Sequence, residues 1–371
     1  MATISITPIV AFLFLCCHEL NIVNASSNKY GEHPGNDYLT PYRPGNHGPR
    51  HSHRYIRDCV GREEGELIHE AYNVHERSTD EPLIEARHFI YDIVSDSGET
   101  HTIQGHHTTV NDPMKLSVLE PSTPGGCDRK DLETVVETGK QKQCIMGLNA
   151  GFFNTSDGSC LGNVISDGRL VVDSGGLINA NFGIKENGQM VFGYFSQEEV
   201  TNPEVPFMQL VAGVIWILKD GEVFINTSKE IECEDMQETG EMDYFVDVLS
   251  ARAAVGHDKE GRLIMVQVDG KTGDHGISLW DFADFLLELG LVNAINLDGG
   301  GSATTVVNET VTGYPTDYCY EDSIFRCARE LSTILCVYDD ELNPVNEGAI
   351  INISRTSVFM MTFLAAVSME N

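Results

Sequence analysis

Two aspartates in the second half of the chain each stand between a strand-like apolar run and glycine. Asp269 occurs in Val-Asp-Gly-Lys, and Asp298 begins the run Asp-Gly-Gly-Gly-Ser that contains Gly300 and ends at Ser302. Glycine permits positive φ and lets a ligand approach the backbone closely. A single Asp-Gly pair is a common turn. Two carboxylates at matched strand ends instead favour a site for acid, base or nucleophilic chemistry.

A second glycine-rich run, Gly-Leu-Asn-Ala-Gly-Phe-Phe, contains Asn149 and Gly151. The Asn149 amide offers both a donor and an acceptor, which suits sugar hydroxyls or an N-acetyl group. A capped turn over core phenylalanines is the alternative. Arg252 is a lone cation among small and apolar residues, so it needs an anionic partner. A structural carboxylate and a bound phosphate both remain open at this point.

His257, His275 and Lys271 are weaker candidates. An unperturbed histidine begins to protonate in a mildly acidic lumen, where it would add positive charge to the site. A surface role is the alternative for each histidine. No cofactor is expected, because neither a dinucleotide fingerprint nor a phosphate-binding loop is present. No metal site is expected either, because the sequence lacks the His and Asp clusters that are typical of two-metal sites.

The two aspartates need elements that bring them together. The apolar stripe of 279–289 predicts a helix, capped by Ser278 and stopped by Gly290. Strand-like segments at 262–268 and 291–297 flank it. Strand, helix and strand predict a βαβ unit whose strands are parallel neighbours. Both carboxylates should then emerge at one edge of the sheet, where ligands are favoured.

Elsewhere the chain has strand-length runs separated by turn dipeptides. The segments 213–218 and 222–226 around Asp220-Gly221 predict a hairpin, because Asp-Gly supplies positive φ. Asp167-Gly168 and Asn187-Gly188 repeat the signal. The predicted class is α+β, with strand-rich mixed sheets and few helices.

The 371 residues include 24 Lys and Arg against 56 Asp and Glu, a net charge of -32 with histidine neutral. Without a dense basic cluster, this charge excludes a general nucleic-acid binder. The 41% hydrophobic and 22% charged composition is that of a folded globular protein. An anionic substrate would have to be met by a local cation.

Several features point to the secretory pathway. Residues 1–25 read as a signal peptide, 26–57 as a disordered propeptide-like leader ending in Arg-Tyr-Ile-Arg, 58–340 as the catalytic domain and 341–371 as a tail. Eight dispersed cysteines beyond the signal favour disulfides over a zinc site. Sequons predict glycosylation at Asn154, Asn226, Asn308 and Asn352. The apolar stretch 358–369 is too short to span a bilayer. It can be a lipid-anchor signal, a truncated membrane segment or a buried or frayed end of the chain, so membrane attachment stays open.

The chain resembles the phosphodiester glycosidase family. The runs that carry the resemblance are Cys-Leu-Gly-Asn at 160–163, Ser-Gly-Gly-Leu at 174–177, Gln-Glu-Thr-Gly at 237–240, Ser-Ala-Arg at 250–252 and Asn-Ala-Ile-Asn-Leu-Asp-Gly-Gly-Gly-Ser-Ala-Thr at 293–304. The resemblance implies removal of N-acetylglucosamine from phosphate on the mannoses of lysosomal hydrolases, which exposes mannose 6-phosphate. The implied location is the Golgi lumen or secretion, and related enzymes self-associate, so a homo-oligomer is one expectation. It implies disulfides joining Cys59 to Cys233, Cys127 to Cys160, Cys144 to Cys336 and Cys319 to Cys327.

Carried over by motif, the implied site residues are Asn149, Arg252, Asp269, Asp298, Gly300 and Ser302. We predict Asp298, Asp269 and Arg252 as catalytic residues. The predicted substrate-binding residues are Asn149, Gly151, Gly300, Ser302 and His257. Arg252 would hold the phosphate while one aspartate acts as nucleophile or as base for water. Two rival hypotheses remain. One is a metal-dependent phosphodiesterase that attacks phosphorus, and the other is a secreted carbohydrate-binding or calcium-binding glycoprotein.

Overall fold

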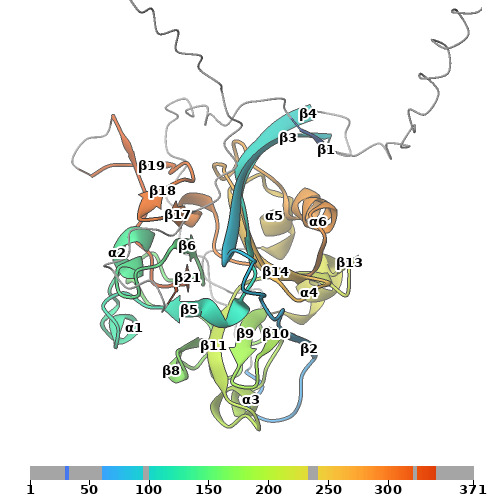
Figure 1. The fold of residues 1–371 in the computed structure, drawn as a ribbon, viewed down its shortest axis with the longest axis vertical. Helices are drawn as coiled ribbons and strands as arrows, with labels where there is room; N and C mark the ends of the chain where they lie inside the picture. Colours follow the sequence, from blue (N-terminus) through green and yellow to red (C-terminus); the bar gives the residue numbers. More distant parts are fainter. Residues whose placement is uncertain (1–29, 33–60, 95–99, 233–240, 321–323, 340–371) are drawn as a thin grey trace, which may run out of the picture.

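The structure, a computed structural model, describes residues 30–32, 61–94, 100–232, 241–320 and 324–339. Within these ranges the strands form sheets of eight, six, five and two strands, and every pair is antiparallel (Figure 1). The predicted strand-rich α+β class is confirmed.

The eight-stranded sheet positions the two aspartates. Its strands, in spatial order, are β1 (Tyr30–Glu32), β3 (Ile84–Val94), β4 (Thr100–Val110), β15 (Leu263–Val268), β14 (Arg252–Asp258), β16 (Leu291–Asn296), β12 (Trp216–Lys219) and β13 (Glu222–Val223). The prediction that the strands around the long helix are neighbours is wrong, because β14 lies between β15 and β16. Both strands are antiparallel to β14 and therefore parallel to each other. Their carboxyl ends still meet at one edge of the sheet.

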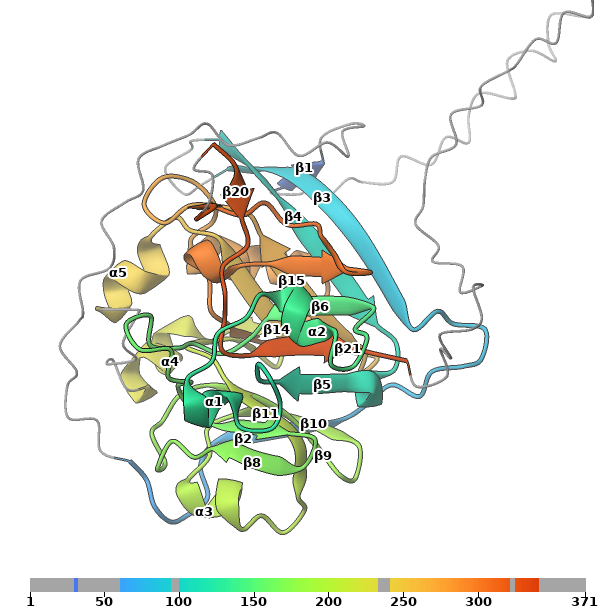
Figure 2. The same cartoon turned by 90° about the vertical axis from the view of Figure 1, so that its left-hand side faces the viewer.

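Two further large sheets complete the body. The six-stranded sheet has the order β2 (His69–Asn73), β10 (Gln189–Gly193), β9 (Asn181–Lys185), β11 (Phe207–Ala212), β7 (Val164–Ser166) and β8 (Arg169–Val172). The five-stranded sheet has the order β18 (Thr310–Val311), β17 (Thr305–Val307), β6 (Met146–Asn149), β21 (Ile334–Val337) and β5 (Leu116–Leu119). A short hairpin of β19 (Asp317–Tyr318) and β20 (Arg326–Cys327) stands apart from them. Figure 2 shows β5 of the five-stranded sheet beside β11 of the six-stranded sheet.

The helices are short apart from one. They are α1 (Gly126–Arg129), α2 (Val135–Gly139), α3 (Gln197–Thr201), α4 (Ile225–Ile231), α5 (Met242–Asp247) and α6 (Leu279–Glu288), with 3-10 turns at Pro113–Lys115 and Gly300–Ser302. The predicted long helix is confirmed as α6: Ser278 accepts from the Asp281 N–H at 3.1 Å, and Gly290 follows with φ +89°. None of the helices described is long and apolar enough to cross a membrane.

The predicted hairpin at Asp220-Gly221 is confirmed, but its second strand is shorter than expected. Asp220 and Gly221 have φ values of 52° and 78°, and Lys219 pairs with Glu222 across the turn. The strand ends at Val223, because Ile225 begins α4. Ile225 and Ser228 are buried one helical turn apart, a helical spacing that outweighs the alternation of a strand.

Both faces of the eight-stranded sheet are buried. Ile264 and Val266 face a core that includes Phe282 and Phe285 of α6. Leu263 and Met265, on the other face, pack in a second core with residues of the other two large sheets. Because alternate residues point to opposite faces, this double burial explains why β15 reads as a continuous apolar run.

Three of the four expected disulfides are present: Cys127 to Cys160, Cys144 to Cys336 and Cys319 to Cys327. The expected pair of Cys59 and Cys233 lies outside the described residues. Of the predicted glycosylation sites, Asn226 and Asn308 are exposed, Asn154 is partly exposed and Asn352 lies outside the described residues. Glycosylation at these positions stays a prediction.

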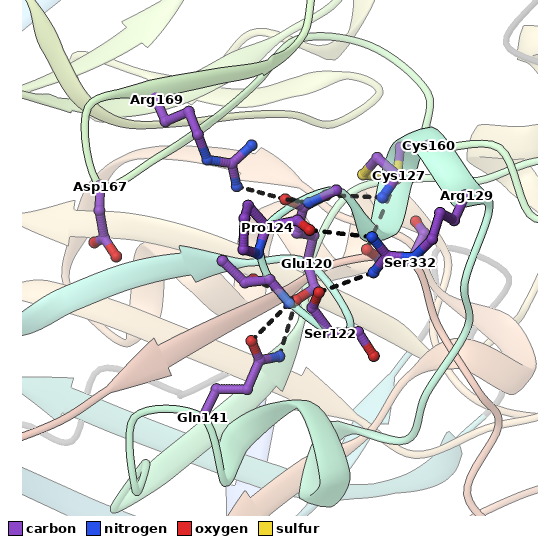
Figure 3. Close-up of polar contacts among 12 residues, drawn as sticks. Glu120, Ser122, Pro124, Cys127, Arg129, Gln141, Cys160, Asp167, Arg169 and Ser332 are labelled. Carbon is purple, nitrogen blue, oxygen red and sulfur yellow. Dashed lines mark hydrogen bonds and ion pairs between the residues drawn. A yellow bond between two sulfur atoms is a disulfide. The ribbon is translucent and has the colours of Figure 1, made fainter.

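A buried carboxylate holds the turn that leads into α1. The Glu120 side chain is fully buried and accepts from the backbone N–H groups of Gly125 at 2.9 Å and Cys127 at 2.7 Å. Arg169 of β8 forms an ion pair with it (Figure 3). Burial alone would raise the pKa of Glu120, but the two N–H groups and the guanidinium outweigh it and lower the pKa. This carboxylate is therefore structural.

Candidate active site

A pocket opens where β15 and β16 end and β14 begins. Its lining residues are Phe152, Thr155, Tyr244, Phe245, Val248, Ser250, Arg252, Thr272, Asp298, Gly299, Gly300, Gly301, Ser302 and Arg329. The structure therefore brings together four of the predicted site residues: Arg252, Asp298, Gly300 and Ser302.

Arg252 is buried in the wall of this pocket. Its side chain is only 2% exposed, and it donates to the carbonyl oxygens of Phe245 at 2.7 Å, Val248 at 2.8 Å and Ile277 at 3.4 Å. Among the residues that the structure describes, no carboxylate forms an ion pair with it. Burial lowers the pKa of the guanidinium to about 9, so it stays charged at neutral and acidic pH. The sequence left two kinds of partner open for Arg252, a structural carboxylate and a bound phosphate. The described residues provide no structural carboxylate for it.

Asp298 lies at the start of the glycine-rich loop, half-buried at the pocket. Its Oδ1 accepts from the Gly299 N–H at 2.8 Å, and its own N–H donates to the Ala150 carbonyl at 3.0 Å. Gly299 is required for packing, because a Cβ there would lie 2.5 Å from the Ala251 carbonyl oxygen. The glycines thus let the loop lie against the residue that precedes Arg252.

Asn149 holds this loop in place. The side chain is fully buried at the end of β6. Its Nδ2 donates to the Asp298 carbonyl at 2.5 Å, and its Oδ1 accepts from the Thr304 N–H at 3.1 Å. Both ends of the amide are therefore engaged with backbone, and Asn149 does not line the pocket. The sequence predicts that Asn149 contacts a sugar, whereas in the structure its side chain links the two ends of the glycine-rich loop.

Asp269 is separated from the pocket by the sheet. Arg252 and Val268 are paired across β14 and β15 and share a face, so Asp269, the next residue, points to the opposite one. Its Oδ1 accepts from Gln267 Nε2 at 2.8 Å and from the Tyr314 N–H at 2.9 Å. Burial raises its pKa to about 6. The expectation that both aspartates reach one edge is met, but only Asp298 lines the pocket.

The other predicted residues also lie away from the pocket. His257 is near the far end of β14, about 17 Å along the strand from Arg252 at roughly 3.3 Å per residue. Its ring is buried against Tyr72 and Phe192, so the predicted substrate contact is wrong. Gly151 is buried with its N–H donating to Thr333 Oγ1, and neither Lys271 nor His275 lines the pocket.

Sequence reasoning missed Arg329. This residue lines the pocket and forms a two-point ion pair with Asp317, with Nε to Oδ2 at 2.7 Å and Nη2 to Oδ1 at 3.2 Å. Its Nη1 donates to Ser302 Oγ at 3.3 Å. The local signal is weak, because Arg329 follows Cys327 in a stretch with no glycine or periodic pattern. The argument used for Arg252, a cation in a strongly acidic chain, could have found it.

Aromatic residues were also missed as pocket walls. Phe152 comes from the segment after β6, while Tyr244 and Phe245 belong to α5. Tyr244 is half exposed, and the Arg252 guanidinium lies 4.9 Å from the centre of the Phe245 ring. The pocket thus combines an apolar wall with a buried cation and a carboxylate.

The chain is similar to several known proteins. A model of the phosphodiester glycosidase family matches residues 142–338. The chain is 51% identical over 66% of its length to the mouse N-acetylglucosamine-1-phosphodiester alpha-N-acetylglucosaminidase and 43% identical over 83% of its length to the human one. It covers 48% and 58% of those two proteins, so it spans about half the length of the curated relatives it matches.

A solved structure is similar over almost its whole length. It is the zebrafish N-acetylglucosamine-1-phosphodiester alpha-N-acetylglucosaminidase catalytic domain, described as auto-inhibited by its pro-peptide. The match has 48% identity and a TM-score of 0.70, and covers 82% of this chain and 98% of the zebrafish one. Because it covers 82% of this chain, the structural likeness extends beyond the residues 142–338 of the family match.

Proposed function

Because the chain belongs to the phosphodiester glycosidase family, we propose that it hydrolyses N-acetylglucosamine-α-1-phospho-6-mannose on N-glycans of lysosomal enzymes. The products are N-acetylglucosamine and mannose 6-phosphate. This is the activity that the names of the mouse, human and zebrafish relatives describe for those proteins.

The observation that carries the proposal is the buried Arg252. A desolvated guanidinium held by carbonyl oxygens is costly unless an anion completes its environment. Its hydrogen bonds to the described residues use Nε and Nη2, which leaves the Nη1 side of the planar group for a phosphate oxygen. In a chain of net charge -32, this cation supplies the local attraction that a phosphodiester requires.

Asp298 supplies the carboxylate of the reaction. The bond between the anomeric carbon and the bridging oxygen breaks, and its electron pair stays with the phosphate. The leaving phosphomonoester is a stable anion, so a strong general acid is unnecessary. Asp298 then acts as nucleophile toward the anomeric carbon or as base for the attacking water. Asn149 holds the Asp298 carbonyl and the other end of the glycine-rich loop in position.

The aromatic wall of the pocket is the proposed binding surface for the sugar. Phe152, Tyr244 and Phe245 offer flat apolar surfaces, and the Tyr244 hydroxyl adds a polar group at the half-exposed rim. Pockets of this kind fix orientation with few polar groups among apolar walls. The acetyl group and the apolar ring face of N-acetylglucosamine match this surface, and the phosphate then lies toward Arg252.

The direct test is incubation of the purified protein with N-acetylglucosamine-α-1-phospho-6-mannose in heavy-oxygen water. We expect free N-acetylglucosamine that carries the label. Label in the phosphate would reject the scheme and favour the rival phosphodiesterase, as would loss of activity on chelation of metals. Binding of the substrate without any product would favour the carbohydrate-binding alternative.

The cellular role follows from the product. Exposed mannose 6-phosphate is a targeting signal for lysosomal enzymes, so the proposed partners are their phosphorylated high-mannose glycans. The proposed location is the Golgi lumen or the exterior. Buried disulfides such as Cys144 to Cys336 support an oxidising compartment.

The leader is the proposed regulator. The zebrafish catalytic domain is described as auto-inhibited by its pro-peptide. This chain has Arg54-Tyr-Ile-Arg57, a minimal cleavage site for a secretory-pathway proprotein convertase, at the predicted end of its own leader. We expect the chain that starts at Asp58 to be more active than one that retains 26–57. Replacing Arg57 by alanine should keep the longer form uncleaved and slow, and equal activity of both forms would reject this role.

A further inference from the structure

Arg329 reaches the pocket from a different part of the chain than Arg252. It lies two residues after β20, and its partner Asp317 begins β19, so the pair closes the base of the β19 and β20 hairpin. The disulfide of Cys319 and Cys327 joins the residue after β19 to the end of β20. The hairpin therefore presents an oriented guanidinium to the pocket.

The glycine-rich loop is shaped to receive this guanidinium. A Cβ on Gly301 would lie 2.1 Å from Arg329 Nη2 and 3.0 Å from Asp317 Oδ1. On the other side of the loop, Gly300 donates its N–H to the Ala251 carbonyl at 2.9 Å. The loop that begins at Asp298 thus lies between the segment of Arg252 and the pair of Arg329 and Asp317.

The charge of the phosphate changes during the proposed reaction. A phosphodiester carries one negative charge, whereas the departing phosphomonoester carries about -1.5 to -2 at pH 7 because its second pKa is about 6. Arg252 alone matches the charge of the substrate. The additional negative charge arises only as the bond to the sugar breaks, so a group that meets it lowers the barrier without tightening substrate binding.

We propose that Arg329 is this group: a second phosphate-binding cation that stabilises the charge gained by the leaving phosphate, with Asp317 as its positioning residue. The inference rests on the proposed function. The two-point pair with Asp317 fixes the plane of the guanidinium, which a flexible lysine ammonium could not reproduce. During the step, the electron pair of the broken bond goes to the bridging oxygen, and Arg329 faces the oxygens of the phosphate that then leaves.

Arg329→Lys tests the role, measured by release of N-acetylglucosamine from N-acetylglucosamine-α-1-phospho-6-mannose. We expect kcat to fall about a hundredfold while KM changes little, since the lost interaction forms mainly in the transition state. Arg326→Lys is the matched control. It makes the same exchange in the same hairpin, where Arg326 stacks on Tyr318 and does not line the pocket, and we expect kcat to stay within twofold.

A binding measurement separates this role from a structural one. Mannose 6-phosphate should inhibit the wild-type protein more strongly at pH 7, where it is mostly a dianion, than at pH 5. Arg329→Lys should weaken that preference. Equal inhibition of the wild type at both pH values would overturn the proposal, and so would equal loss of kcat in Arg326→Lys. Absence of product with the wild type would instead reject the proposed function.

Discussion

Arg252 and Asp269 lie at the same edge of one sheet but on opposite faces of it. Arg252 is paired with Val268, and Asp269 is the next residue along β15. Arg252 therefore reaches the pocket, while Asp269 is buried against Gln267 and the backbone of Tyr314. The alternation of side chains along a strand thus places Arg252 at the pocket and Asp269 in the interior on the other face of the sheet.

Asp298→Asn should abolish turnover and leave the fold intact. The amide keeps the size of the side chain but can act neither as nucleophile nor as base. We expect kcat to fall by about a thousandfold or more, with an unchanged thermal unfolding curve. Release of N-acetylglucosamine is the measurement, and near-normal release would remove Asp298 from the carboxylate role.

Asp269→Asn should leave kcat nearly unchanged and alter the pH dependence of stability. Both hydrogen bonds to the carboxylate end on Oδ1, and an asparagine oxygen can accept both. The folded pKa of about 6 lies above the ordinary value of 3.8, so the folded state binds more protons. Wild-type stability should then fall as pH rises from about 4 to 6, by up to about 3 kcal/mol.

The asparagine variant should lose this slope. Urea unfolding at a series of pH values is the measurement, and Asp298→Asn serves as the comparison for activity. A large loss of kcat in Asp269→Asn with the fold intact would return Asp269 to the catalytic role predicted from the sequence.

Arg252→Lys should impair phosphate recognition. The lysine ammonium cannot satisfy three carbonyl oxygens and a phosphate with the planar geometry of the guanidinium. We expect kcat/KM to fall about a hundredfold, with a raised KM and weaker inhibition by mannose 6-phosphate. Circular dichroism checks the fold. Unchanged KM and inhibition in a folded variant would contradict the assignment of the phosphate to Arg252.

Glu120→Gln should destabilise the fold without affecting the pocket. The glutamine loses the charge that pairs with Arg169 and turns an amide NH₂ toward backbone donors, which costs about 1–3 kcal/mol. The lowered pKa of Glu120 means that the wild-type advantage is present above its ordinary value of 4.5 and is lost as pH falls below it. Urea unfolding at pH 7 and pH 4 measures both effects.

Glu137→Gln is the matched control for this variant. Glu137 forms an exposed ion pair with Lys140, which contributes less than about 1 kcal/mol. Equal unfolding free energies for the two variants at pH 7 would show that the buried contacts of Glu120 contribute no more to stability than the exposed ion pair of Glu137.

Local signals predicted the parts of the fold that depend on neighbouring residues. The cap of α6 at Ser278 and the turn at Asp220-Gly221 follow from backbone preferences that act over a few positions. The order of the strands does not, because β14 lies between β15 and β16 through pairings that no local pattern encodes. The pattern of strand, helix and strand predicted that β15 and β16 run in the same direction and end at one edge of the sheet. It did not predict which strands lie beside them.

The same distinction divides the site residues. Asp298 and Ser302 belong to a glycine run whose composition marks a close backbone approach, and Arg252 is conspicuous as a cation among apolar residues. Arg329 and the aromatic wall come from segments that only the folded chain brings close. His257 failed as a prediction because its distance from Arg252 depends on the length of β14, which the motif alone does not reveal.

The Asn149 side chain is hydrogen-bonded to Asp298, which lies 149 residues further along the chain, and to Thr304, which lies 155 residues further along. Contacts of such separation form late, because the loop between them must first be closed. The five-stranded and eight-stranded sheets therefore have to meet before the glycine-rich loop acquires its shape. We therefore expect a refolding chain to regain its β-structure before its activity.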